Sequence, residues 1–96
     1  MVVQLKWLGR ALRNLREEAD YIAQDDPTAA ARVVLRIESA VALLVTQPAL
    51  GRAGRVPGTR ELIVPETPYV VPYRIRGQQV EVLRVFHARR RWPMEF

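Results

Sequence analysis

Apolar side chains recur every three or four residues in two stretches of the first half of the chain. The first stretch predicts an amphipathic helix over residues 9–24, with the apolar stripe Leu8, Leu12, Leu15, Ala19 and Ile22. The second predicts a helix that starts after Asp26 and ends before Pro48, with the stripe Ala30, Val34, Ile37, Val41 and Leu44, widened by Val33, Ala40 and Leu43. Asp26 suits the N-cap, and Pro27 suits the first helical position. The short Asp-Asp-Pro connection predicts an antiparallel helical hairpin.

The second half of the chain follows the shorter period of strands. It predicts three strands, 60–64, 69–76 and 80–87, whose short connections favour an antiparallel meander. Residues 2–7 predict a short N-terminal strand. The last strand is expected to place Val80, Val82, Arg84 and Phe86 on one face and Glu81, Leu83, Val85 and His87 on the other. Residues 48–59 hold three glycines and two prolines, so we expect a loop without regular structure there.

Pro72 lies in the middle strand, although proline cannot donate a hydrogen bond to a sheet. Either that strand is bulged, or its missing N–H points away from a partner. The pattern as a whole predicts an α+β fold: an N-terminal strand, a helical hairpin, and a three-stranded antiparallel meander packed on the helices. We assign residues 1–93 to this single domain. One interpretation of residues 94–96 is a remnant of cloning, because Glu-Phe is what a common restriction site encodes.

The charge of the chain is concentrated in its second half. The net charge is +5, and residues 1–50 are neutral, so all of it comes from residues 51–96, which have nine arginines, four glutamates and no lysine. Arginine binds phosphate and carboxylate groups in a fork geometry, so this half predicts an acidic partner, either nucleic acid or protein. The alternative is a solvated basic surface. No apolar run approaches the length of about 18 residues that a membrane span needs, and the N-terminus does not resemble a signal peptide, so we expect a cytoplasmic protein with no membrane partner.

Several kinds of catalytic site are excluded by residue type. The chain has one histidine and no cysteine, so it cannot form a Cys–His pair. No spacing of histidines or carboxylates fits a metal site, and we expect no metal and no cofactor. Ser39 is the only serine, and it lies on a helix far from the histidine in sequence. The glycine-rich GRAGRVPG stretch lacks the Lys-Ser/Thr pair of a phosphate-binding loop.

An arginine–histidine surface remains as the candidate for chemistry. We expect Arg60, Arg74, Arg89 and His87 to come close on neighbouring strands. Nearby positive charge favours a neutral imidazole, which can take a proton from a ribose 2′-hydroxyl while arginines stabilise the charged phosphorane. This set would suit a metal-free ribonuclease. The alternative is that His87 bonds a backbone carbonyl at a strand end and that the arginines are a solvated tail.

Two tryptophans flank these elements. Trp92 follows the arginines and could stack on a nucleic-acid base, but we favour a role as an anchor that folds the tail back against the helices. Trp7, beside the first strand, is expected in the core.

Four segments in order resemble the RelE/ParE superfamily of bacterial toxins, over about residues 3–93. They are YIAQDDPTAAARVV, QPALGRAGRVPGTRELIV, PYVVPYRI and VEVLRVFHARRRWP. The resemblance implies the toxin half of a type II toxin–antitoxin module, with the same helical hairpin and meander. It also implies one of two mechanisms, because RelE-like members cut messenger RNA on the ribosome whereas ParE-like members inhibit DNA gyrase.

Residue comparison favours the ParE-like mechanism. RelE-like nucleases carry basic residues on the first meander strand, where this chain has only Arg60. They also carry an arginine beside the aromatic of the second strand, and Val70 follows Tyr69 here. His87 matches a histidine of some nucleases, but gyrase-type members have it as well. Gyrase inhibition would use a contact surface that includes Arg52, Arg55, Arg89, Arg90, Arg91 and Trp92. Ribosomal mRNA cleavage would use His87 as base with Arg60, Arg74 and Arg89.

The resemblance also predicts partners. A cognate acidic antitoxin is expected to fold over the toxin, and operator DNA is expected to be bound only through that antitoxin. A third possibility is an inactive relative that is retained for antitoxin binding and control of its own operon.

Overall fold

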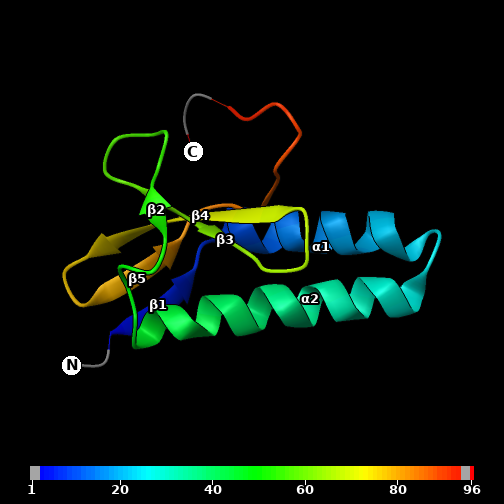
Figure 1. Ribbon diagram of the computed structural model, residues 1–96, viewed down its shortest axis with the longest axis horizontal. Helices are drawn as coiled ribbons and strands as arrows, with labels where there is room; N and C mark the ends of the chain where they lie inside the picture. The colour runs from blue at the N-terminus through cyan, green and yellow to red at the C-terminus, as the bar shows by residue number, and fades with distance from the viewer. Residues whose placement is uncertain (1–2, 94–95) are drawn as a thin grey trace.

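A computed structural model describes residues 3–93 and 96 and consists of a helical hairpin packed on a mixed sheet (Figure 1). The helices are α1 (Gly9–Ala23) and α2 (Pro27–Ala42), followed by a 3-10 turn η1 (Leu43–Val45). The strands are β1 (Gln4–Trp7), β2 (Arg52–Ala53), β3 (Arg60–Ile63), β4 (Tyr69–Arg76), β5 (Gln79–Val82) and β6 (Phe86–His87). The predicted α+β class and element order are confirmed. Residue 2 of the expected first strand and residues 94–95 of the expected tail lie outside the described part.

The sheet has the order β1-β5-β4-β3-β2, and β6 also pairs with β4. β1 runs parallel to β5, and the other pairs are antiparallel. The expectation of an irregular loop over 48–59 is wrong at Arg52–Ala53, which pair with Glu61 and Arg60. A hydrogen bond from Gly54 N to Thr59 O (2.8 Å) closes this small hairpin. A Cβ on Gly54 would lie 2.1 Å from Thr59 Oγ1, so the glycine permits the close approach.

The helices lie together on one side of the sheet, and the C-terminal segment lies on the other (Figure 1). Asp26 caps α2 as predicted, because its carboxylate accepts from Ala29 N at 3.1 Å. Leu12 and Leu43 were expected to be buried but are about half exposed. In α1 the completely buried residue is Ala11, about 100° around the helix from Leu12. Among the described residues, neither helix is long and apolar enough to cross a membrane.

The core fills the space between the hairpin and one face of the sheet. Its buried members come from α1, α2, η1 and the strands: Ala11, Ile37, Ala40, Val41, Leu44, Leu62, Val64, Tyr69, Val71, Tyr73, Val80, Val82 and Val85. Trp7, which was expected in the core, is partly buried and packs against this cluster. The opposite face of the sheet carries Glu61, Pro72 and Arg74, which the register places beside one another.

The expected continuous strand 80–87 is wrong, because it is broken opposite Pro72. Tyr73 pairs with Val82, and Val70 pairs with Phe86, so two residues of β4 lie opposite three residues of the partner. This is a bulge of one residue, located in the partner strand rather than in β4. Leu83 N still donates to Pro72 O at 2.9 Å. The extra residue shifts the alternation, so the core contains Val85 instead of Arg84.

Candidate functional site

The arginines and the histidine expected to form a nuclease site are spread over the sheet. In register, Arg60 lies opposite Tyr73 and His87 opposite Tyr69. Those two tyrosines are four residues apart on β4, which is about 13 Å along a strand. Arg74 pairs with Glu81 and points to the other face. The structure therefore does not bring Arg60, Arg74 and His87 into one site.

Arg60 and Arg74 also form hydrogen bonds with other groups of the protein. Arg60 donates to the carbonyl oxygens of Gly51 (2.8 Å) and Ala49 (3.3 Å). Arg74 Nε donates to Glu81 Oε1 at 2.5 Å. This hydrogen bond is the main reason that the pKa of Glu81 lies below its ordinary value. Both guanidinium groups therefore have structural partners.

His87 ends β6 and organises the turn that follows. Its ring lies edge-on to Tyr69, with centroids 5.6 Å apart. Its Nδ1 accepts from Arg89 N at 3.2 Å, and its carbonyl oxygen accepts from Arg90 N at 3.1 Å. The same carbonyl accepts from the indole N–H of Trp92 at 3.1 Å. His87 thus fixes the start of the C-terminal tail, which we define as residues 88–93.

A carboxylate on α1 holds the tail at a second point. Glu18 accepts from Tyr69 Oη at 2.9 Å and forms an ion pair with Arg90. The Arg90 guanidinium also lies 5.6 Å from the Tyr21 ring centroid. Burial, followed by the bond to Glu18, raises the pKa of Tyr69 to about 12, so this phenol keeps its proton at neutral pH. Arg90 is therefore a tether of the tail.

Trp92 holds the tail at a third point through stacking. The guanidinium of Arg55 lies 3.5 Å from the Trp92 ring centroid, and the Phe86 ring lies 4.8 Å from it. Arg84 covers Phe86 at 4.7 Å. Trp92 is an anchor, as favoured from the sequence. It packs on the face of the sheet opposite the helices, however, so the expectation of an anchor against the helices is wrong.

Arg55 is itself fixed by a buried carboxylate. Glu61 is only 2% exposed, and it accepts from the Arg55 backbone N–H (2.8 Å) and Arg55 Nε (3.2 Å). Arg52 donates to its other oxygen at 3.1 Å. Burial raises the pKa of Glu61, but the hydrogen bonds and charges of the two arginines outweigh it, so the net pKa lies below the ordinary value. Glu61 is thus a charged residue held in place by paired arginines.

The described contacts divide the five arginines and the one tryptophan that were proposed from the sequence as a contact surface into two groups. Arg52, Arg55, Arg90 and Trp92 are held by Glu61, by Glu18 or by stacking. Arg89 and Arg91 are exposed and form no ion pair with any carboxylate in residues 3–93. Two solvent-facing guanidinium groups therefore project from a tail that three anchors hold in place.

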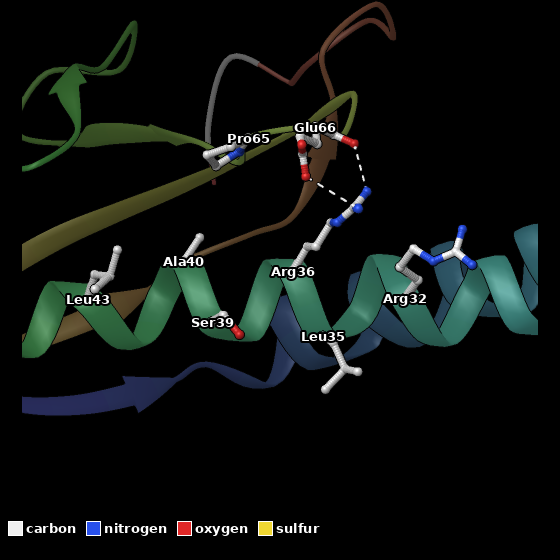
Figure 2. A pocket seen from close by; sticks show the side chains of 8 residues that line it. All are labelled: Arg32, Leu35, Arg36, Ser39, Ala40, Leu43, Pro65 and Glu66. Atoms are coloured by element: carbon white, nitrogen blue, oxygen red, sulfur yellow. Dashed lines mark hydrogen bonds and ion pairs between the residues drawn. The ribbon is translucent and has the colours of Figure 1, made fainter.

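A second surface feature is an apolar groove that follows α2 to the edge of β3, here named the α2 groove. One part of it, of about 470 Å³, lies between α2 and Pro65 (Figure 2). An adjoining part of about 410 Å³ shares Ala40, Leu43 and Pro65 and reaches Leu50 and Ile63. Leu35, Leu43, Leu50 and Ile63 are 47–63% exposed. Such a contiguous apolar surface is typical of an interaction site.

Arginines surround the α2 groove. Arg32 and Arg36 come from α2, and Arg52 borders the part next to β3. Figure 2 shows Arg36 directed at Glu66, with which it forms an ion pair of 3.3 Å. This groove was not predicted from the sequence. The available signal was three apolar residues in a row, Val33 to Leu35, because three successive helical positions span about 200° and cannot all face one core.

Among the described residues, no three histidine or carboxylate side chains group closely enough to hold a metal ion.

A model of the family described as "ParE toxin of type II toxin-antitoxin system, parDE" matches residues 5–92. The putative toxin Y4kP of Sinorhizobium fredii is 52% identical over 90 residues, which cover 94% of this chain and 93% of that protein. Toxin RelE2 of Caulobacter vibrioides is 36% identical over 89 residues, which cover 93% and 99% of the two chains.

Two solved structures show the same arrangement. A chain from the chromosomal ParDE toxin–antitoxin system of P. aeruginosa superposes with a TM-score of 0.80 at 30% identity and covers 90% of this chain and 96% of its own. A chain of the RelBE2 toxin–antitoxin complex of Mycobacterium tuberculosis has a TM-score of 0.60 at 25% identity, with coverage of 91% and 99%.

Proposed function

The chain belongs to the ParE toxin family of type II toxin–antitoxin systems, and from this premise we propose that it inhibits growth by binding DNA gyrase and that a cognate antitoxin neutralises it. The family match supports the gyrase target. The higher TM-score to a ParDE chain than to a RelBE2 chain points the same way. Binding to gyrase requires a presented surface and no chemistry from the toxin itself.

We favour gyrase binding over RNA cleavage because Arg60, Arg74 and His87 lie far apart in the structure. Cleavage of RNA by a metal-free site needs a base and cationic groups on the same phosphodiester, within hydrogen-bond reach of the reacting atoms. Here Arg60 and Arg74 lie on opposite faces of the sheet, and each is bonded to another group. His87 is about 13 Å along β4 from the level of Arg60. This arrangement favours a binding protein.

We propose that the tail is the surface that binds DNA gyrase. Arg89 and Arg91 supply the exposed charges, while Trp92, Arg90 and Arg55 hold the tail in place. Arg52 contributes only indirectly, because it binds Glu61, which in turn holds Arg55. A held segment loses less conformational entropy on binding than a loose one, so anchoring increases the affinity of a short contact segment.

Ribosomal mRNA cleavage is the second candidate. Two Caulobacter relatives at 36% identity bear the name RelE. His87 stands at the end of the last strand near Arg89 and Arg91, which form no ion pair within residues 3–93. In that case His87 would act as the base, with Arg89 at the phosphate. Arg60 and Arg74 would have to leave their present partners to take part.

The antitoxin is proposed to occupy the α2 groove. The groove is apolar along its length and has arginines at its rim, so it suits an amphipathic segment with acidic flanks. Both solved relatives come from toxin–antitoxin systems, which supports a partner of this kind.

Growth assays on variants test the proposed contact surface. We expect Arg89→Gln with Arg91→Gln to abolish toxicity, because it removes both exposed charges of the tail. We expect His87→Ala to retain toxicity, because alanine keeps the backbone carbonyl that accepts from Arg90 N and from the Trp92 indole. Arg13→Gln with Arg16→Gln removes the same charge from the exposed side of α1 and serves as the control. Loss of toxicity in His87→Ala alone, with new mRNA ends by primer extension for the wild type in a translating extract, would favour the ribonuclease instead.

A further inference from the structure

We infer that Glu61 is a positioning residue for the C-terminal tail, acting through Arg55 and Trp92. Glu61 does not touch the tail itself, and it lies on β3, about thirty positions earlier in the chain. Its connection to the tail consists of two contacts in series. The consequence for toxicity rests on the proposed function, whereas the consequence for the tail's structure does not.

The first contact fixes Arg55 by a buried charge. One oxygen of Glu61 accepts both the backbone N–H and Nε of Arg55, so the carboxylate sets the path of the loop and the direction of the side chain together. A carboxylate buried to 98% needs compensating charge, and Arg52 supplies the rest of it at the other oxygen. Arg55 therefore has one stable orientation while Glu61 is ionised.

The second contact transfers that orientation to Trp92. Arg55 Cζ lies 3.5 Å from the centroid of the Trp92 ring, which is a close cation–π contact. Phe86 packs on the indole at 4.8 Å, and the indole N–H is donated to His87 O. With its N–H donated and its ring packed against Arg55 and Phe86, Trp92 serves as the anchor of the tail rather than as a contact to a partner.

Beyond Ala88 the tail depends on such outside support, because residues 89–93 are not part of a strand or helix. Residues 88–93 form a turn and an extended segment without strand or helix. A backbone hydrogen bond from Ala88 N to Pro68 O (2.7 Å) and the turn at His87 fix the start of the tail. Beyond that start, its described anchors are Trp92 on Arg55 and Arg90 on Glu18. Arg91 lies between these two anchors in sequence, so its exposed guanidinium is placed by both.

The first experiment compares Glu61→Gln with Glu81→Gln in the full chain. Both replace a buried glutamate that is bound to arginine on the same face of the sheet, but only Glu61 is connected to Trp92. Incorporation of 5-fluorotryptophan gives one ¹⁹F NMR signal for each of the two tryptophans, and a Trp92→Phe variant assigns them. We expect the Trp92 signal to move toward the solvent-exposed position in Glu61→Gln and to stay unchanged in Glu81→Gln.

Tryptic cleavage after the tail arginines gives a second readout of the same change. We expect it to be at least about tenfold faster in Glu61→Gln than in the wild type, because cleavage tracks the population of the open tail. Arg55→Lys separates the two contacts: it keeps a charge for Glu61 but loses the planar stack, so it should also release Trp92. Growth inhibition, which does not depend on the identity of the target, should fall in both variants while circular dichroism shows an intact fold.

Three results would overturn the role of Glu61 in positioning the tail. An unchanged Trp92 signal and cleavage rate in Glu61→Gln would show that the tail does not depend on Glu61. Equal changes in Glu81→Gln would show general loosening of the sheet. A released tail with full toxicity would refute the functional role of the positioning. A wild type that leaves gyrase unaffected would contradict the proposed target, and the tail measurements would still decide the role of Glu61.

Discussion

Tyr73 brings a hydroxyl group into the core, and the hydroxyl organises the loop after the helical hairpin. It donates to Pro48 O at 2.7 Å and accepts from Gly51 N at 2.8 Å. Burial is the main reason that the pKa of Tyr73 is raised, so it stays a neutral donor. This side chain thus replaces the regular structure that the proline- and glycine-rich loop lacks.

Gly51→Ala is expected to destabilise the protein by about 1–3 kcal/mol, the usual cost of overpacking a closed site. A Cβ there would lie 2.6 Å from Tyr73 Cε1 and 2.9 Å from Glu61 O, and the backbone oxygen cannot move freely. Urea denaturation measures the change. Gly9→Ala is the matched control, since nothing lies within 4 Å of its added methyl group. Equal stability of the two variants would contradict the close packing at Gly51.

The lowered pKa of Glu61 gives a prediction for acid conditions. A depressed carboxyl pKa contributes stability that is complete above the unfolded value of about 4.3 and is lost as the pH falls through the lower folded value. The free energy of unfolding should therefore decline on acidification below about pH 5. Glu81, whose pKa is lowered chiefly by Arg74, adds to the same decline.

Glu61→Gln should reduce this acid dependence, because its side chain does not titrate. Urea denaturation at several pH values between about 7 and 3 would measure it. We expect the variant to be less stable than the wild type at neutral pH and to approach it at low pH. Parallel curves for the two proteins would show that the Glu61 carboxyl has the same pKa in the folded and unfolded states.

Among the secondary-structure elements, helix α1 supports the bulge opposite Pro72 through hydrogen bonds to Asn14. Asn14 Oδ1 accepts from Val85 N (3.1 Å) and from Arg84 Nε (2.8 Å). The helix thereby satisfies a backbone N–H that the interrupted pairing of the strand leaves free. The bulge in turn rotates Val85 into the core.

Replacing Asn14 with alanine should cost about 1–3 kcal/mol of stability, because a backbone N–H in a partly buried site loses its acceptor. Asn14→Asp keeps an acceptor oxygen and should remain near the wild type. The measurement is the free energy of unfolding of both variants in urea. An aspartate variant as unstable as the alanine variant would argue that the amide group acts by shape rather than by accepting the hydrogen bonds.

The sequence predicted those helices and strands whose position depends on nearby residues alone, such as a cap or the spacing of apolar side chains. The cap at Asp26, the strand 69–76 and the order of helices and strands follow from spacing and from single residues such as Pro27. The split of strand 80–87 did not follow, because its cause, Pro72, lies on the neighbouring strand. Similarly, β2 forms in a glycine-rich segment because Glu61 and Arg60 offer it a partner edge.

The sequence names candidate site residues but does not determine their geometry. The sequence singled out His87, Trp92 and the arginines, yet it could not show that Arg60 and Arg74 face opposite sides or that Glu61 is buried between Arg52 and Arg55. Glu61 is not marked by any sequence pattern. Its role depends on the loop before β3, which folds so that Arg55 contacts its carboxylate.

At the scale of the whole molecule, the tail and the α2 groove occupy different places. The tail extends from the face of the sheet opposite the helices, and the groove lies along α2 (Figure 1, Figure 2). A partner segment in the groove leaves the exposed Arg89 and Arg91 of the tail uncovered. The two surfaces are linked through Glu61 and Arg52, which line the groove and also belong to the network that holds Arg55 and Trp92. The proposed antitoxin would bind at the first surface, and the proposed target at the second.

Leu43→Glu should weaken antitoxin binding at least about tenfold, since it puts a charge into the apolar groove without a partner, and should leave toxicity intact. Leu12→Glu is the control, because Leu12 is equally exposed on α1 but does not line the groove. Titration calorimetry with the purified antitoxin and growth assays with and without it give both readouts. Unchanged antitoxin affinity in Leu43→Glu would exclude the groove as its site.

Inhibition of DNA gyrase, the function that we propose for this toxin, is measured by a supercoiling assay with purified gyrase, relaxed plasmid and purified toxin. We predict that the wild-type toxin inhibits supercoiling in proportion to its concentration, that added antitoxin reverses the inhibition, and that the variant with Arg89→Gln and Arg91→Gln is inactive. Full supercoiling in the presence of a toxin preparation that still arrests growth would contradict the account.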